Sequence, residues 1–229
     1  MSERVFLITG ASSGIGQATA RRAAEAGFRL VLAARSEDRL EALVGELGGR
    51  ERAIAVRADV SSAEDQQAMA ARAVDAFGRI DVVFANAGMP GTPGGFAGAD
   101  PEVWRRMILT NVLGVGLTVQ ATLPHVRRSR GHILLTGSVA GRRTLAGSMY
   151  SASKWAVSAI GYGLREELKG SGVRVTLIEP GMVETAFFDE PKPDALRPDD
   201  IARSVLFAVE QPAHVDLHEV LVLPTPPVE

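Results

Sequence analysis

A tyrosine and a lysine, Tyr150 and Lys154, are the side chains in this sequence best suited to acid–base chemistry. They open a helical pattern that runs to about residue 170, and a helix advances 3.6 residues per turn, so both side chains share one face. A free phenol, with a pKa near ~10, exchanges protons poorly at neutral pH. A neighbouring ammonium favours the phenolate and lowers that pKa, which would make Tyr150 a usable general acid or base. The same spacing also arises by chance on exposed helices, so the pair needs support from the rest of the chain.

The composition limits the classes of protein to be considered. A length of 229 residues and a formal net charge of −2 suit one α/β domain over residues 1–229. The near-neutral charge gives no field that would attract nucleic acid or an anionic membrane. The chain enters a predicted strand within a few residues and shows no apolar run near the ~18 residues of a membrane helix. We therefore expect a cytoplasmic protein with no nucleic-acid or membrane partner.

Thiol and metal chemistry are not expected. The sequence has no cysteine, which excludes disulfides, thiol catalysis and thiolate metal sites. None of the histidines shows metal-ligand spacing with a carboxylate, so we interpret all of them as structural or solvent-facing. They are His125, His132, His214 and His218.

A glycine-rich turn separates the first predicted strand, residues 4–8, from a helical pattern that ends near residue 26. The turn reads Thr9-Gly10-Ala11-Ser12-Ser13-Gly14-Ile15-Gly16. Glycines allow a tight turn and let backbone amides approach a phosphate, while the helix behind supplies free N–H groups and a positive dipole end. With a strand before and a helix after, the turn predicts a dinucleotide site rather than a simple connector. Its spacing is GxxxGxG, not GxGxxG.

The second predicted strand, residues 29–33, ends close to Arg35. In nucleotide-binding folds an acid at this strand end binds the adenosine ribose hydroxyls, whereas an arginine accommodates a 2′-phosphate. The nearby Asp38 carboxylate lies inside the next helical segment. Arg35 therefore favours NADP(H) over NAD(H), which stays possible, and an ordinary surface charge is the alternative interpretation.

Strand and helix patterns alternate through the whole chain, which predicts a Rossmann-type, doubly wound parallel sheet of about seven strands with helices on both faces. Polar and glycine residues follow the strand ends, where ligands bind in such sheets. The remaining strands are expected at residues 53–56, 80–84, 132–135, 173–178 and 219–223. The segments that follow them include Asp59-Val60, Asn86-Ala87-Gly88, Ser138-Val139-Ala140 and Pro180-Gly181-Met182-Val183-Glu184-Thr185.

Taken together, these segments resemble the short-chain dehydrogenase/reductase family, in its NADP(H)-preferring type. The resemblance is carried by Thr9-Gly10-x-x-x-Gly14-x-Gly16, Asn86-Ala87-Gly88, Asn111, Ser138, Tyr150-x-x-x-Lys154 and Pro180-Gly181-x-x-x-Thr185. The motifs match in order and in approximate spacing over essentially the full chain. The resemblance implies hydride transfer between a nicotinamide and the carbonyl or alcohol carbon of a small or medium-sized substrate.

The resemblance also implies a role for each catalytic side chain. Tyr150 would exchange the proton with the substrate oxygen, and Ser138 would hydrogen-bond that oxygen. Lys154 would lower the Tyr150 pKa and hold the nicotinamide ribose. Asn111 would hold a water that feeds protons to Lys154, and Thr185 would orient the nicotinamide ring.

Further residues are implied as ligand contacts. The cofactor residues are Gly10, Ser12, Ser13, Gly14, Ile15, Gly16, Arg35, Asp59, Val60, Asn86, Ala87, Gly88, Tyr150, Lys154, Pro180, Gly181, Val183 and Thr185, and the substrate residues are Ser138, Ala140, Tyr150, Met182, Phe187 and Phe188. One NADP-using subgroup has a basic residue where this chain has Ser13, so the cofactor preference rests on Arg35. No metal ligand is implied.

Two other functions stay open: an NAD-dependent dehydrogenase of hydroxy compounds, and a dinucleotide-sensing protein without turnover. Similar proteins often form tetramers by pairing the helices around residues 100–128 and 150–169, so a homo-oligomer is expected, with a dimer as the alternative. The small residues Ala152, Ala156, Ala159 and Gly163 would allow close packing of two such helices, although burial within one chain would explain them as well.

Overall fold

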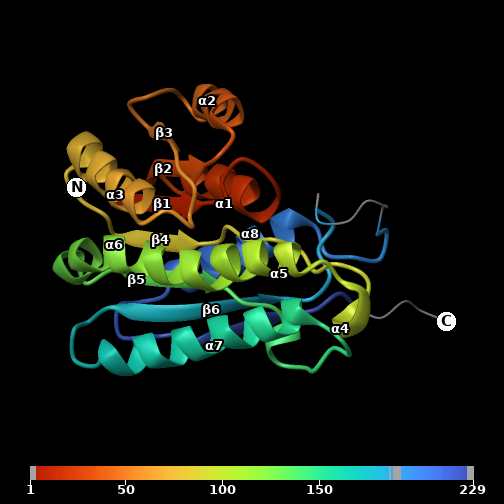
Figure 1. Ribbon diagram of the computed structural model, residues 1–229. Helices are drawn as coiled ribbons and strands as arrows, with labels where there is room; N and C mark the ends of the chain where they lie inside the picture. The colour runs from red at the N-terminus through yellow and green to blue at the C-terminus, as the bar shows by residue number, and fades with distance from the viewer. Residues whose placement is uncertain (1–3, 186, 188–191, 226–229) are drawn as a thin grey trace.

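The strand nearest the N-terminus, β1 (Val5–Thr9), is buried at every position. Successive side chains of a strand point to opposite faces, so Val5 and Leu7 face one side of the sheet while Phe6 and Ile8 face the other. All four are apolar, and a sheet with two apolar faces must be covered on both. Figure 1 shows this arrangement: helices lie in front of and behind one central sheet. The structure, a computed structural model, describes residues 4–185, 187 and 192–225.

The strands within these described ranges form one sheet in the order β3-β2-β1-β4-β5-β6-β7. Every neighbouring pair is parallel, as predicted, and the strand bounds differ from the expected ones by at most two residues. The other strands are β2 (Arg29–Ala34), β3 (Ala53–Arg57), β4 (Val82–Ala85), β5 (His132–Thr136), β6 (Arg174–Pro180) and β7 (Glu219–Val222).

The start of β1 is joined to the residue just before β4. The backbone N–H of Val5 donates to Asp81 Oδ2 at 2.9 Å, and Asp81 N–H donates to the Val5 carbonyl at 3.0 Å. The guanidinium of Arg79 binds the same carboxylate, with Nε 2.8 Å from Oδ2. This buried carboxylate is therefore fully partnered and fixes β1 against β4, the two central strands.

The helices form one layer on each face of the sheet (Figure 1). The first layer contains α1 (Gly14–Glu25), α2 (Glu37–Glu46) and α8 (Pro198–Val209), and the second contains α3 (Ala63–Phe77), α6 (Gly114–Ser129) and α7 (Met149–Glu167). Two shorter helices, α4 (Gly95–Gly98) and α5 (Pro101–Ile108), precede α6. The segment 89–99 therefore contains one helical turn.

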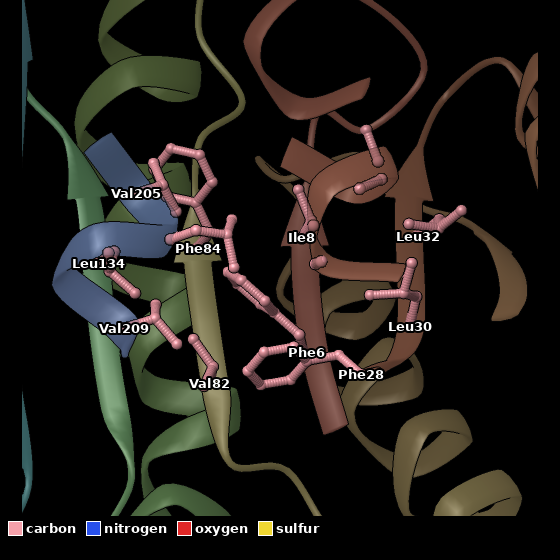
Figure 2. Close-up of a cluster of buried hydrophobic side chains, with 14 of the residues drawn as sticks. Phe6, Ile8, Phe28, Leu30, Leu32, Val82, Phe84, Leu134, Val205 and Val209 are labelled. Atoms are coloured by element: carbon pink, nitrogen blue, oxygen red, sulfur yellow. The ribbon is translucent and has the colours of Figure 1, made fainter. Parts of the chain in front are cut away.

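Figure 2 shows the core on the first of these faces. Phe6 of β1 packs edge-on against Phe28, with ring centroids 5.5 Å apart. From the helix layer, Val205 and Val209 of α8 reach down to the same face. Near these two valines lie Val82, Phe84 and Leu134, while Leu30 and Leu32 belong to the part of the cluster on the other side of β1.

Helix starts follow the predicted capping residues. Ser62 accepts the Asp65 N–H at 3.1 Å, and Asp100 accepts the Glu102 N–H at 2.9 Å ahead of Pro101. The carboxylate of Asp65 does not return a bond to Ser62. It accepts the backbone N–H of Asp59 at 2.8 Å and so holds the chain just after β3.

The expectation that no segment has the length and apolarity of a membrane helix is wrong. The continuous helical segment Pro101–Ser129 meets both criteria by length and composition. In the structure its α6 part packs on β4, β5 and α3. Its inward side chains, Met107, Val115, Val119 and Val126, are buried there.

One histidine makes stability depend on pH. His132 is buried, with Nε2 2.7 Å from Thr176 Oγ1, and burial, assisted by the Arg174 charge, lowers its pKa to about 3. The unfolded chain binds a proton here below a pKa of ~6.5, whereas the folded chain does not until about pH 3. Stability is therefore lost as the pH falls through this window. We expect this group to remove about 2 kcal/mol of unfolding free energy between pH 7 and pH 5.

The measurement is urea unfolding at both pH values for the wild type, His132→Asn and the exposed-site control His214→Asn. The drop should shrink by about 2 kcal/mol only in His132→Asn. An unchanged drop in that variant would contradict the assignment.

Candidate active site

A cavity of about 490 Å³ opens at the carboxyl edge of the sheet. This is the edge at which ligands bind in open α/β sheets, where the strand order reverses beside the first strand. The predicted residues that line it are Gly10, Ser12, Ser13, Gly14, Ile15, Arg35, Asp59, Val60, Asn86, Ala87, Gly88, Ser138, Tyr150, Lys154, Pro180, Gly181, Val183, Thr185 and Phe187.

The glycines of this turn occupy positions where a side chain would not fit. Gly10 and Gly14 have φ angles of +67° and +55°, a region that L residues rarely adopt. A Cβ on Gly16 would lie 2.4 Å from the Gly10 carbonyl oxygen and 2.7 Å from Asn86 Nδ2. Gly16 therefore lies behind the cavity wall and lets α1 approach β1. The N-terminus of α1 consequently faces the cavity through Gly14 and Ile15.

Thr9 and Asn86 join three strand ends below this turn. Thr9 Oγ1 accepts the backbone N–H groups of Asn86 at 3.0 Å and Ala87 at 3.2 Å. The Asn86 side chain donates to the Thr9 carbonyl at 3.0 Å and accepts from Thr136 Oγ1 at 3.2 Å. The ends of β1, β4 and β5 are thereby held at fixed separations.

Arg35 and Asp59 lie at the β2 and β3 end of the cavity. Arg35 is exposed, and it forms no ion pair with a carboxylate in the described part of the chain. Asp59 Oδ1 accepts the Ser61 hydroxyl at 2.7 Å and the Ser61 N–H at 2.9 Å. These two bonds, more than the Arg35 charge, lower the Asp59 pKa. The Arg35 guanidinium, which has no ion-pair partner in the described residues, and the ionised Asp59 carboxylate therefore lie at the same end of the cavity.

Tyr150 and Lys154 both face the cavity from the first turns of α7. Ser148 caps this helix by accepting the Ser151 N–H at 3.0 Å. Lys154 is buried; its Nζ donates to the Thr136 carbonyl at 2.8 Å and lies 5.7 Å from the centre of the Tyr150 ring. The predicted proximity of the two side chains is thus present.

The expected direction of the Tyr150 pKa shift is wrong for this structure. Burial raises the pKa of Tyr150, and the nearby Ser138 hydroxyl opposes this rise without overcoming it. Burial also lowers the pKa of Lys154 to about 8, because the buried ammonium has lost its water. Burial therefore disfavours the charged forms of both groups: the Tyr150 phenolate, and the Lys154 ammonium that was expected to stabilise it.

Ser138 follows β5 and begins a 3₁₀ turn (Val139–Gly141). Its hydroxyl accepts the Ala140 N–H at 3.1 Å and donates to the Pro180 carbonyl at 3.5 Å. It also lies near the Tyr150 hydroxyl and opposes the rise of the Tyr150 pKa. Two of the predicted catalytic hydroxyls therefore meet inside the cavity.

Asn111 lies outside the cavity lining, on a π-helical turn (Leu109–Leu113). Its side chain is 1% exposed and bonds Met89 twice, accepting the N–H at 2.7 Å and donating to the carbonyl at 3.1 Å. It also donates to Ser153 Oγ at 3.2 Å, next to Lys154. Asn111 thus ties the segment after β4 to the catalytic helix, and the water proposed beside it stays a prediction.

The segment after β6 contributes alternate residues. Gly181, Val183 and Thr185 line the cavity, whereas Met182 points outward and is 48% exposed. Met182 therefore lies outside the lining of this cavity, and its contact with a substrate stays a prediction. Ala140 does not line the cavity either, since it is buried under the 3₁₀ turn. Phe188 lies outside the described residues.

Sequence reasoning missed several lining residues. These are Ala34, Ser36, Ala58, Met89, Pro90, Thr110, Thr136 and Gly137. Thr136 was detectable, since it is the last residue of β5 and the rule that ligands bind at strand ends applies to it. Met89 and Pro90 carried no such signal. Within the described part of the chain, no group of His, Asp and Glu side chains is arranged to hold a metal ion.

Known proteins match both the sequence and this fold. The family model for short chain dehydrogenase matches residues 4–195. An uncharacterized oxidoreductase of Staphylococcus saprophyticus is 36% identical over 231 residues, and the match covers 98% of each chain.

Two solved structures superpose closely. The alcohol dehydrogenase from the archaeon Thermococcus sibiricus, complexed with 5-hydroxy-NADP, has a TM-score of 0.88 at 34% identity and covers 96% of this chain and 95% of that chain. The 3-ketoacyl-(acyl-carrier-protein) reductase of Brucella melitensis, complexed with NADH, has a TM-score of 0.89 at 29% identity, with coverage of 97% and 98%. With its sheet order, glycine turn and these matches, the chain belongs to the short-chain dehydrogenase/reductase family of oxidoreductases.

Proposed function

We propose that this oxidoreductase transfers a hydride between a nicotinamide dinucleotide, preferably NADP(H), and the carbonyl or alcohol carbon of a small or medium-sized substrate. One observation carries the proposal: the glycine turn and the Ser138, Tyr150 and Lys154 side chains line the same cavity. Binding and catalysis would then share one unit over residues 1–229, and a cytoplasmic location is part of the same proposal.

The glycine turn fits a dinucleotide. Any side chain at Gly10 or Gly16 would collide with Ala87 or the Gly10 carbonyl, so the turn stays a bare cradle of backbone beside a helix N-terminus. Thr185 lies against Gly14, its methyl carbon 3.3 Å from where a Cβ would stand, which brings the β6 segment to the same ligand. A bound nicotinamide would supply the hydride donor or acceptor.

The protein would move the proton. A raised pKa keeps the Tyr150 phenol protonated at neutral pH, which suits a general acid that protonates the substrate oxygen during reduction. Ser138 lines the cavity beside that phenol and would donate to the same oxygen, so the developing charge would meet two donors. Lys154 would orient the ribose and place its charge beneath the site.

We expect Tyr150→Phe to lower turnover by about 10²- to 10⁴-fold, because the variant lacks the proton donor. NADPH binding should stay within about twofold, since the ring remains. The assay is NADPH consumption over ketones, aldehydes and 3-oxoacyl thioesters, with the reverse reaction on hydroxy acids; NADPH fluorescence gives the affinity.

The matched control is Tyr162→Phe, which removes the same hydroxyl from the exposed end of α7 and should keep full turnover. Residual turnover above about a tenth in Tyr150→Phe would refute the acid role. Dinucleotide binding by the wild type without turnover of any panel member would instead favour a sensing protein.

The preference for NADP(H) is supported by Arg35. Its guanidinium lies exposed at the cavity wall without a carboxylate partner in the described residues, which suits contact with a 2′-phosphate. NAD(H) is the alternative, since the Brucella melitensis reductase is complexed with NADH whereas the Thermococcus sibiricus enzyme carries an NADP derivative.

Removing this charge should weaken NADPH selectively. A hydrogen bond to a charged group contributes about 1.5–3 kcal/mol, so Arg35→Ala should raise the NADPH Kd roughly 10- to 100-fold and leave the NADH Kd within about twofold. Arg39→Ala, on the exposed side of α2, is the control and should change neither. Tighter binding of NADH than NADPH by the wild type would overturn the preference.

We also propose that copies of the chain associate as a homotetramer, with a dimer as the alternative. Ala152, Ala159 and Gly163 are exposed along α7, and Trp155 on the same helix is 48% exposed. Burial within the chain therefore does not account for this row of small residues. A second α7 would cover it.

Light scattering at micromolar concentration tests this association. Ala159→Arg places a charged side chain on the small-residue row of α7 and should reduce the measured mass toward that of a monomer. Ala71→Arg, at an exposed position of α3, is the control and should keep the wild-type mass. A monomeric wild type would contradict the proposal.

A further inference from the structure

An ion pair between the buried Glu179 and the partly exposed Arg142 lies directly behind the turn that carries Ser138. Glu179, the next-to-last residue of β6, has 0% exposure, and both its carboxylate oxygens lie 2.9 Å from Arg142 Nε. Arg142 follows the 3₁₀ turn and also contacts Glu219 of β7. None of these charges faces the cavity or enters the proton transfer described above.

An ion pair is an energetically unfavourable way to fill a protein core. Removing a carboxylate such as that of Glu179 from water costs several kcal/mol, and apolar side chains of similar volume often stabilise a protein as well or better. The neighbours of Glu179 along β6, Leu177 and Ile178, are apolar and fully buried. The backbone also makes room for this side chain, since a Cβ on Gly137 would lie 2.9 Å from Glu179 Cγ. Stability alone therefore does not account for the pair.

The opposite side of the turn is held by the catalytic helix. Ser151 Oγ donates to the Ala140 carbonyl at 2.6 Å. A Cβ on Gly141 would lie 2.7 Å from the Lys154 carbonyl oxygen, so the turn touches the α7 backbone directly. The turn is thus fixed between α7, which carries Tyr150, and β6.

Ser138 depends on this fixation. Its bonds to backbone are a 3.1 Å bond from Ala140 N–H, within the turn itself, and a long 3.5 Å bond to the Pro180 carbonyl. The Arg142–Glu179 pair adds a side-chain link between the turn and β6, beyond the backbone pairing of β5 with β6 that ends at Thr136 and Ile178. Loss of the pair would let the turn shift along α7 and move the Ser138 hydroxyl away from Tyr150.

We propose that Arg142 and Glu179 are positioning residues, whose ion pair sets the Ser138 hydroxyl against the Tyr150 hydroxyl. This inference rests on the proposed function. Displacement of a catalytic group by about 1 Å lowers rates by as much as about 10²-fold. We therefore expect Arg142→Met to lower kcat about 10- to 100-fold, with the NADPH Kd unchanged within about twofold.

A double-mutant cycle separates positioning from a general loss of stability. Arg142→Met, Ser138→Ala and the double variant are compared by kcat, KM and NADPH affinity. If Arg142 acts through Ser138, the double variant should turn over at the rate of Ser138→Ala alone. Multiplicative losses would overturn the inference.

Milder variants keep the test decisive if Arg142→Met does not fold. Glu179→Gln retains shape but removes the charge and should lower kcat at least about threefold, while Arg142→Lys should recover part of the Arg142→Met loss. The control Arg165→Met breaks an ion pair between α7 and Asp216, away from the turn, and should leave kcat unchanged.

The outcomes also distinguish the two proposals. An inactive wild type would reject the proposed function. An active wild type with inactive Tyr150→Phe, but with unchanged Glu179→Gln and Arg142→Met, would reject only the positioning role.

Discussion

The hydroxyl of Thr9 is the contact on which the geometry of the site depends. It accepts two backbone N–H groups from the chain leaving β4 and so joins the ends of the two strands beside which the cavity opens. Parallel strands leave polar groups at their carboxyl ends, and those groups need partners when they are buried. Thr9 and Asn86 supply them within the protein, which leaves the backbone of the glycine turn available to a ligand.

The catalytic helix and the residues around it show a second constraint. Lys154 is buried with a backbone carbonyl as its hydrogen-bond acceptor, and Asn111 is aimed at Met89 and Ser153 by a π-helical turn. Such turns are rare and are found mostly at functional sites, because they place one side chain where a regular helix cannot. The helix departs from regular α geometry at Leu109–Leu113. This departure lets Asn111 fix the segment after β4 to α7.

The sequence was sufficient for features that depend on local pattern. Apolar runs of four to seven residues, separated by helical periods, predicted the parallel sheet, and the glycine spacing and Tyr150–Lys154 predicted which strand ends line the cavity. Sequence reasoning failed where contacts between residues far apart in the chain determine the outcome. The direction of the Tyr150 pKa shift depends on burial by segments far along the chain, and the place of Met182 outside the cavity lining depends on the path of the segment after β6. The Arg142–Glu179 pair joins residues 37 apart, and neither position is unusual by its neighbours alone.

The central place of β1 has a consequence for how the chain is made. This strand leaves the ribosome before β2 and β3. It can pair with β2, and β2 with β3, once residue 57 has emerged. Its other edge pairs with β4, which ends at residue 85, and the hydrogen bond between Val5 and Asp81 can form only after residue 81 has emerged. At roughly 5–20 residues per second, translation leaves an apolar open edge for a few seconds. Open apolar edges recruit other strands, so a nascent chain stalled between these points is the form of this protein most in need of a chaperone.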